Sequence, residues 1–72
     1  MGNLMNMDLQ HVYRITWLVG AYGESLRSLF HLAEDQTVRL VQNLGNGVII
    51  SLEGRTLALS DEAARSVKVM PA

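Results

Sequence analysis

The sequence predicts a mainly β fold: a small, mostly antiparallel β-barrel with one helix inserted between the first two strands and a short helical turn before the last strand. Two observations lead to this prediction. Short runs of alternating apolar and polar residues recur along the chain, as in strands with one buried face. Between the first two runs, apolar residues recur at helical spacing. The chain has 72 residues, which allows one domain.

The N-terminal residues 1–11 show neither the alternation of a strand nor the apolar spacing of a helix. We therefore expect a flexible arm that precedes a barrel domain of residues 12–72. The arm carries three of the four methionines of the chain: Met1, Met5 and Met7. Thioethers bind soft ions such as Cu(I). A tail rich in Gly, Asn and Gln is more often disordered than a metal site. We therefore expect residues 1–11 to be disordered and to hold no metal ion.

The first strand is predicted over residues 13–19, because apolar and polar residues alternate there. Residues 20–23 contain two glycines and end this strand. A helix is then predicted over residues 24–32. The strand is expected to face the core with Tyr13, Ile15, Trp17 and Val19, and the helix with Leu26, Leu29, Phe30 and Ala33.

The strongest pattern is a β-hairpin made of residues 48–52 and 55–59. The two runs flank Glu53 and Gly54, and glycine can take the positive φ that a tight hairpin turn requires. Alternation then places one set of apolar side chains on the buried face of the hairpin: Val48, Ile50, Leu52, Leu57 and Leu59.

Two shorter segments complete the predicted fold on either side of the hairpin. A second strand over residues 38–41 leads into the polar, glycine-rich loop of residues 42–47. After the hairpin, Ser60 can cap a short helical turn, and residues 67–69 resume the alternation of a strand. The expected core is Ile15, Trp17, Leu40, Ile50, Leu52, Leu57, Leu59 and Val67.

Composition narrows the function classes. The absence of cysteine excludes disulfides and thiolate metal sites, and favours a cytoplasmic protein. Six Lys and Arg against seven Asp and Glu give a net charge of -1, without the basic clusters of a nucleic-acid surface. No apolar run is long enough to span a membrane.

The second half of the chain resembles the FeoA family of ferrous iron transport proteins. The family pattern has a Gly-x-Gly entry, a valine-rich strand, a turn glycine, a Leu-Ala-Leu strand end and a closing Val-x-Val. The matching residues are Gly45, Gly47, Val48, Ile50, Leu52, Gly54, Leu57, Ala58, Leu59, Ala64, Val67 and Val69. The chain departs from the family at the end of the helix, where Glu34 and Asp35 stand in place of a Pro-Gly turn.

The resemblance implies an SH3-like barrel and the role of a cytoplasmic accessory protein of ferrous iron uptake. Such a protein would act by contact with the FeoB transporter, without chemistry of its own. The alternative is a detached FeoA-like C-terminal domain of a metal-dependent transcription regulator. No helix-turn-helix precedes the predicted barrel, so a regulator would require a second chain.

The sequence offers few residues for chemistry. His11 and His31 lie in no motif with Ser, Asp or Glu, so we expect no enzyme. The best metal-ligating candidates are His31, Glu34 and Asp35, which would hold Fe(II) only weakly. Side chains that are neighbours at a helix end are more often solvated than bound to a metal ion. The expected partner-binding residues lie on the loop of residues 20–23, on the helix and on the loop of residues 42–47: Tyr22, Glu24, Arg27, Asn43 and Asn46.

Overall fold

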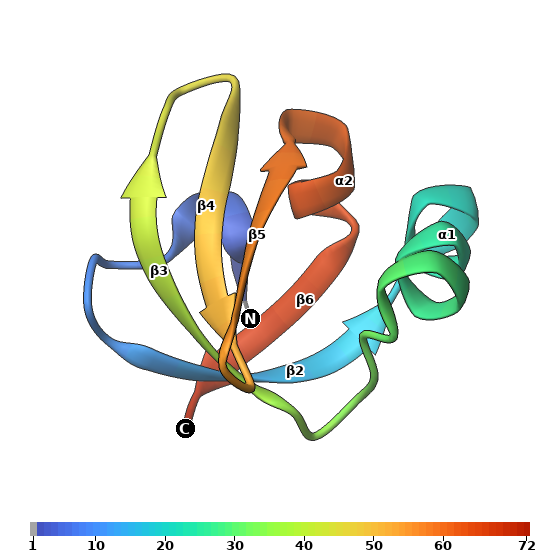
Figure 1. Ribbon diagram of the computed structural model, residues 1–72, viewed down its shortest axis with the longest axis horizontal. Helices are drawn as coiled ribbons and strands as arrows, with labels where there is room; N and C mark the ends of the chain where they lie inside the picture. The colour runs from blue at the N-terminus through green and yellow to red at the C-terminus, as the bar shows by residue number, and fades with distance from the viewer. Residues whose placement is uncertain (1) are drawn as a thin grey trace.

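Six strands form one antiparallel sheet in the order β1-β6-β2-β3-β4-β5, accompanied by two α-helices and one 3₁₀ helix (Figure 1). The computed structural model describes residues 2–72. Its elements are β1 (Gly2–Asn3), η1 (Leu4–Asn6), β2 (Val12–Leu18), α1 (Gly20–Phe30), β3 (Thr37–Asn43), β4 (Gly47–Leu52), β5 (Arg55–Ser60), α2 (Asp61–Arg65) and β6 (Val67–Pro71). The predicted mainly β fold, with a helix after the first long strand and a helical turn before the last strand, is confirmed.

The sheet is strongly curled but does not close into a barrel. Within residues 2–72, no strand ladder joins β5 to β1, which are the two edges of the sheet. Instead, α2 packs on β4 and β5, and η1 packs on β4, β6 and α2. The two short helices therefore cover the core on the side where the sheet stays open, and closure of the barrel, expected from the sequence, is not observed.

The hairpin of β4 and β5 has the predicted register, with Gly47 opposite Ser60 and Leu52 opposite Arg55. Gly54 has a φ of 79°, as expected for its turn, and Glu53 also has a positive φ of 50°. Two positive φ angles are the signature of a type I′ turn, whose twist matches that of the strands it joins. The inward face of β4 is fully buried, as predicted from its alternation.

A β-bulge in β2 reverses the alternation predicted for this strand. Ile15 pairs with Val69, and Trp17 pairs with the next β6 residue, Lys68, so Thr16 is the extra residue. After the bulge Leu18 points into the core, and Trp17 is 57% exposed. The prediction that Trp17 lies in the core is therefore wrong, because one inserted residue moves every later side chain to the other face.

Helix α1 begins four residues earlier than predicted, so residues 20–23 are its first turn and not a loop. The amide of Gly23 donates to the carbonyl of Val19. A Cβ on Gly23 would lie 2.6 Å from the carbonyl carbon of Leu18, so only glycine allows this approach of the helix to β2. Leu26 is buried, whereas Leu29 is 70% exposed. The predicted apolar stripe of α1 is thus only partly covered by the core.

The N-terminal segment, predicted to be a flexible arm, forms part of the fold from residue 2 to residue 7; Met1 lies outside the described residues. β1 pairs with β6 through Gly2 and Asn3. Asn3 caps η1, its side-chain Oδ1 accepting from the Met5 amide at 2.8 Å. Leu4 and Met7 are buried in the core. Two apolar residues three positions apart are too short a signal for either period, which is why the sequence does not reveal this segment.

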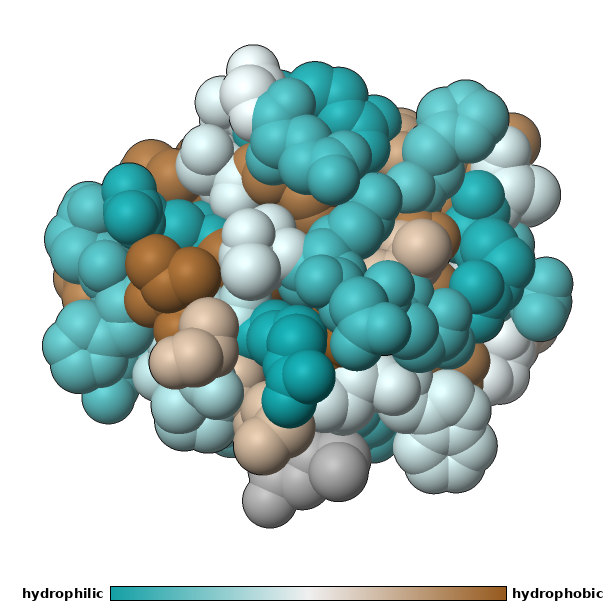
Figure 2. Space-filling model, turned by 90° about the horizontal axis from the view of Figure 1, so that it is seen from below, coloured by the Kyte–Doolittle hydropathy of each residue, from teal (hydrophilic) through white to brown (hydrophobic). Residues whose placement is uncertain are grey.

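Helix α2 is capped as predicted, because the Ser60 hydroxyl accepts from the amide of Ala63. Of the core residues expected from the sequence, Leu57 is partly buried and Trp17 is exposed, and the other six are buried. Seen from below, the surface is mainly hydrophilic, with separate hydrophobic areas (Figure 2). None of the helices in residues 2–72 combines the length and the apolar character needed to cross a membrane.

The bulge in β2 leads to a first prediction about stability. Ile15→Ala should lower the free energy of unfolding by about 2 to 5 kcal/mol, because it leaves a cavity in the core. Trp17→Ala removes a larger but mostly exposed side chain and should cost less than about 1 kcal/mol. Urea unfolding followed by circular dichroism measures both changes. A larger loss for Trp17→Ala than for Ile15→Ala would contradict the bulged register.

The N-terminal packing leads to a second prediction. Leu4→Ala should lower the free energy of unfolding by about 2 to 5 kcal/mol, since Leu4 is completely buried. Leu9→Ala is the matched control: Leu9 is 55% exposed in the loop that follows, and its truncation should have little effect. The same urea titration compares the two variants. Equal stability of both variants would mean that the segment does not contribute to the core.

Candidate interaction surface

Helix α1 carries three of the predicted partner-binding residues and projects from the side of the sheet (Figure 1). Tyr22 is half exposed, and Leu29 and Phe30 further along the helix are also exposed large hydrophobic residues. Tyr22 and Leu29 are seven residues apart and therefore lie on the same side of the helix. Glu24 is also exposed, but it follows Tyr22 by two residues and therefore lies on a different side of the helix. We refer to Tyr22, Leu29 and Phe30 as the α1 apolar surface.

The end of α1 is fixed to the rest of the molecule by two arginines. Arg27 donates two hydrogen bonds to the carboxylate of Glu34, with Nη1 to Oε1 at 2.9 Å and Nη2 to Oε2 at 2.8 Å. Arg55 from β5 donates to the Phe30 carbonyl at 2.8 Å. The α1 apolar surface is therefore held on a positioned helix, which lowers the entropy cost of binding a partner.

The Arg27–Glu34 pair changes the acid-base behaviour of both side chains. The hydrogen bonds from Arg27, followed by the backbone amide of Glu34 itself, lower the pKa of Glu34 from 4.5 to about 2. The hydrogen bond to Glu34 raises the pKa of Arg27 in turn. Arg27 is thus a structural partner of Glu34, and reversing its charge would disturb the helix end as well as any contact with another protein.

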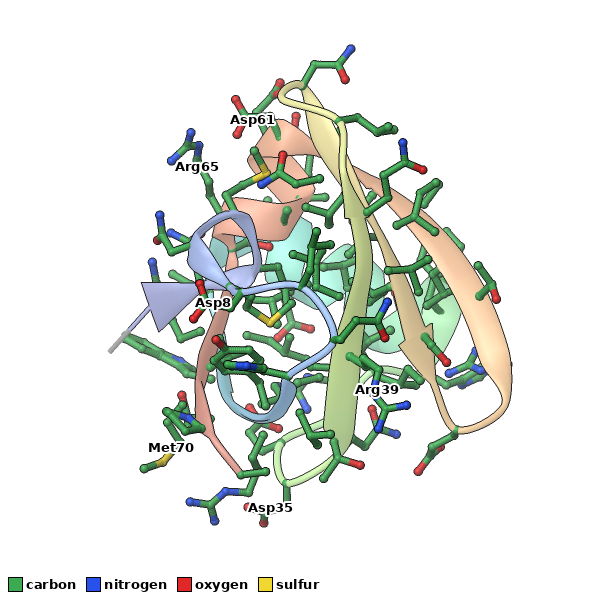
Figure 3. The ribbon with its side chains drawn as sticks, turned by 90° about the vertical axis from the view of Figure 1, so that its left-hand side faces the viewer. Asp8, Asp35, Arg39, Asp61, Arg65 and Met70 are labelled. Carbon is green, nitrogen blue, oxygen red and sulfur yellow. The ribbon has the colours of Figure 1, made fainter. Side chains whose placement is uncertain are left out.

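The three metal-ligating candidates do not converge on one point. Both carboxylate oxygens of Glu34 accept from Arg27. His31 is exposed in the left-handed conformation that ends α1, and the Asp35 carboxylate lies 3.8 Å from the guanidinium of Arg14. Across residues 2–72, no group of three or more His, Cys, Asp or Glu is placed to hold a metal ion. Figure 3 shows the labelled charged side chains, such as Asp8, Arg39 and Asp61, at separate places.

Of the other two predicted partner-binding residues, Asn43 ends β3 and Asn46 lies in the β3–β4 loop, away from α1 (Figure 1). The side-chain Nδ2 of Asn43 donates to the Met5 carbonyl at 3.3 Å, and its Oδ1 accepts from the backbone amide of Gly45 at 2.8 Å. The carbonyl of Asn46 accepts from the amide of Asp61. These contacts hold the loop to η1 and α2. The five predicted residues therefore belong to two distinct surfaces.

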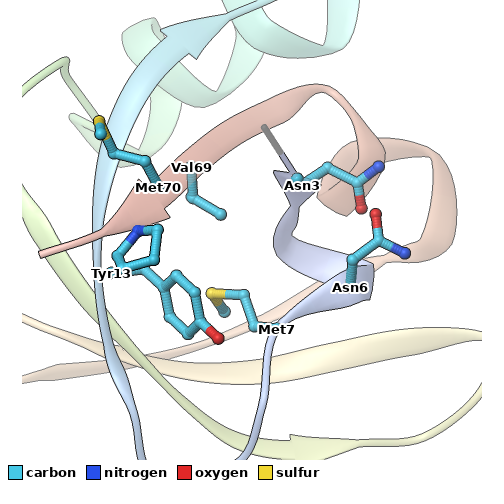
Figure 4. Close-up of a pocket in the computed structure, with 8 residues that line it drawn as sticks. Asn3, Asn6, Met7, Tyr13, Val69 and Met70 are labelled. Atoms are coloured by element: carbon cyan, nitrogen blue, oxygen red, sulfur yellow. The ribbon is translucent and has the colours of Figure 1, made fainter.

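A hollow that sequence analysis did not predict lies between the N-terminal segment and β6 (Figure 4). Its volume is about 410 Å³. The side chains of Tyr13, Met7 and Val69 point into it, and those of Asn3 and Asn6 line its other side. The phenol oxygen of Tyr13 accepts from the amide of Asp8. The hollow exists only because residues 2–7 pack on the sheet, which local sequence patterns do not indicate.

Comparison with known proteins gives a clear result for structure and none for sequence. No family model matches the chain, and no curated protein matches it. The crystal structure of an iron uptake regulatory protein, FeoA, matches with a TM-score of 0.82 at 20% identity, over 99% of this chain and 96% of that one. This chain has the FeoA fold.

Other solved structures show the FeoA fold in proteins of different size. An FeoA-like protein from Clostridium acetobutylicum matches with a TM-score of 0.83 at 12% identity, over 97% of this chain and 85% of that one. The manganese regulator SloR matches with a TM-score of 0.82 at 15% identity. This chain covers 34% of SloR, and 45% of iron(II) transport protein A from Clostridium thermocellum. The resemblance inferred from the sequence is confirmed at the level of the fold.

The lowered pKa of Glu34 gives a third prediction, on the dependence of stability on pH. Because the folded state lowers this pKa, the stabilisation is present above about pH 4.5 and is lost as the pH falls towards about 2. A double-mutant cycle of Arg27→Gln and Glu34→Gln should show a coupling energy between the two side chains at pH 7, and this coupling should disappear as the pH falls towards about 2. Urea titrations of the four proteins at several pH values measure it. Coupling that is constant with pH would exclude the charged pair as its source.

Proposed function

We propose that this chain is an accessory protein of ferrous iron uptake that acts by contact with the cytoplasmic part of an FeoB-type transporter. The supporting observation is the FeoA fold, which extends over the whole chain and over nearly all of an iron uptake regulatory protein of similar length. The role is one of protein binding and not of catalysis. Fe(II) would bind this chain at most weakly through His31, Glu34 or Asp35.

The α1 apolar surface is the part of the molecule that we assign to this contact. Large exposed apolar side chains gathered on a positioned helix are typical of binding surfaces, because their burial against a partner releases water without ordering a loop. The charged side chain of Arg27, three residues before Phe30 on the helix, and that of its partner Glu34 border the surface and would form its polar rim. Glu24 would lie outside this contact. Asn43 and Asn46 would belong to a second contact at the β3–β4 loop.

The alternative function is that of a detached regulator domain. It is favoured by the match to SloR and to a manganese-dependent transcriptional repressor, of which this chain covers 34% and 41%. In that case the chain would bind a protein that carries a DNA-binding domain. Capture experiments with the transporter fragment and with regulators of the same cells distinguish the two functions.

The proposed contact gives a fourth prediction. Leu29→Glu should weaken binding to the purified cytoplasmic fragment of the FeoB-type transporter by about tenfold or more, because it places a charge in the centre of the interface. The variant should stay folded, since Leu29 makes little contact with the core. Biolayer interferometry with the immobilised transporter fragment measures the affinity.

Leu9→Glu serves as the matched control for this experiment, and Leu44→Glu probes the second contact. Leu44→Glu in the β3–β4 loop and Leu9→Glu before β2 introduce the same change at positions that are 51% and 55% exposed. Leu9→Glu should bind like the wild type. A loss of binding in Leu44→Glu but not in Leu29→Glu would move the contact to the β3–β4 loop, and no binding of the wild type would reject the proposed function.

A further inference from the structure

The outer face of β2, β3 and β6 carries three cations in one diagonal row. Val12 on β2 is opposite Arg39 on β3, Arg14 is opposite Met70 on β6, and Trp17 is opposite Lys68 on β6. Arg39, Arg14 and Lys68 therefore follow one another across three neighbouring strands. Diagonal neighbours in a regular antiparallel pair are about 7 to 8 Å apart, which gives the approximate spacing of the row.

Apolar side chains lie on both sides of this row of cations. Val12 and Met70 are exposed, and Trp17 is the most exposed aromatic residue among those described. The bulge at Thr16 is what turns Trp17 to this face. In Figure 1 β2 runs along the lower side of the molecule, and the view from below in Figure 2 shows hydrophobic groups between strongly hydrophilic ones. This face is therefore unlike an ordinary solvated sheet face, which is mostly polar.

The charges of the row are poorly neutralised by the rest of the chain. The ion pairs within residues 2–72 include neither Arg39 nor Lys68, and Arg14 approaches the exposed carboxylate of Asp35 only at 3.8 Å. By contrast, Arg27 and Arg65 are paired with Glu34 and Asp61. The row is therefore a local excess of positive charge on a chain whose net charge is -1.

The hydrogen bonds that Arg14 and Lys68 make within the protein leave other N–H donors of these side chains available to a ligand. Arg14 Nη2 donates to the Met70 sulfur at 3.0 Å, and Lys68 Nζ donates to the Arg65 carbonyl at 3.2 Å. An ammonium has three donors and a guanidinium five, so each group keeps several. Arg39 lines a small hollow of about 140 Å³ together with Ser51 and the acidic Glu53. Arg39 is exposed, so a carboxylate of another protein can reach its guanidinium from solvent.

We propose that this face binds an extended acidic segment of another protein, with carboxylates at alternate positions. Side chains on one face of an extended chain repeat every two residues, about 6.6 to 6.8 Å. This repeat is close to the spacing of the row, so three carboxylates can meet Arg39, Arg14 and Lys68 together. Because successive side chains of an extended chain point to opposite faces, the methylene groups of these same acidic side chains would pack on Trp17 and Met70. This surface is separate from the α1 apolar surface, so the inference does not depend on the proposed function.

A fluorescein-labelled peptide, Glu-Leu-Glu-Leu-Glu, tests the proposal by fluorescence anisotropy with the full chain. The wild-type protein should bind it saturably, and more weakly as salt is added. A peptide with Gln in place of each Glu should bind at least about fivefold more weakly, because it lacks the charges. Absence of saturation up to about 1 mM protein at low salt would overturn the proposal.

Variants of the row locate the binding site. Arg14→Gln combined with Arg39→Gln should weaken binding by roughly five- to tenfold, and Trp17→Ala should weaken it independently. Arg55→Gln is the matched control, because it makes the same change on β5 and should leave binding unchanged. Circular dichroism first establishes that each variant is folded. An equal loss in Arg55→Gln, or tighter binding of a short oligothymidine than of the acidic peptide, would also overturn the proposal.

Discussion

The ladder between β2 and β6 is the part of the structure on which most other contacts depend. It joins the first long strand to the last, and the bulge at Thr16 sits in its centre. The hydroxyl of Thr16 donates to the Lys68 carbonyl at 3.1 Å, which ties the extra residue to the neighbouring strand. Beyond the bulge, Leu18 enters the core and its backbone contacts Gly23 of α1. The position of α1 is thus set by a single inserted residue in β2.

A chain of this size can bury only a limited share of its surface, and its short elements compensate for that limit. Residues 2–7 add Leu4 and Met7 to the core, and α2 adds two alanines. These elements cover the gap between the sheet edges, so the core is enclosed although the strands do not form a closed barrel. An open sheet with helical covers leaves the outer faces of the strands available for contacts with other proteins.

Features that depend on neighbouring residues could be predicted from the sequence. The hairpin, its turn at Gly54 and the cap at Ser60 all have local signals, and the structure has all of them. The bulge at Thr16 could not be predicted, because a threonine in a strand carries no mark of the extra residue. The start of α1 was missed because Gly20 and Gly23 normally interrupt a helix, whereas here the close approach to Leu18 requires Gly23.

The candidate surfaces could be predicted only in part, because they combine residues that are distant in the sequence. Tyr22 and Glu24 were recognised as exposed residues of a helix or its flank. Arg27 is also predicted to bind a partner protein, but its guanidinium is bonded to Glu34, which follows the helix, so the two meet only once α1 has ended. The row of Arg39, Arg14 and Lys68 spans three strands and depends on their register, which alternation alone does not give.

The outward position of Trp17 also decides how this protein can be observed. Trp17 is the sole tryptophan of the chain, and more than half of its surface is already in contact with water in the folded state. Its emission spectrum will therefore resemble that of the unfolded chain and will report poorly on loss of the core. The same indole is a sensitive and unique optical label for whatever covers the outer face of β2.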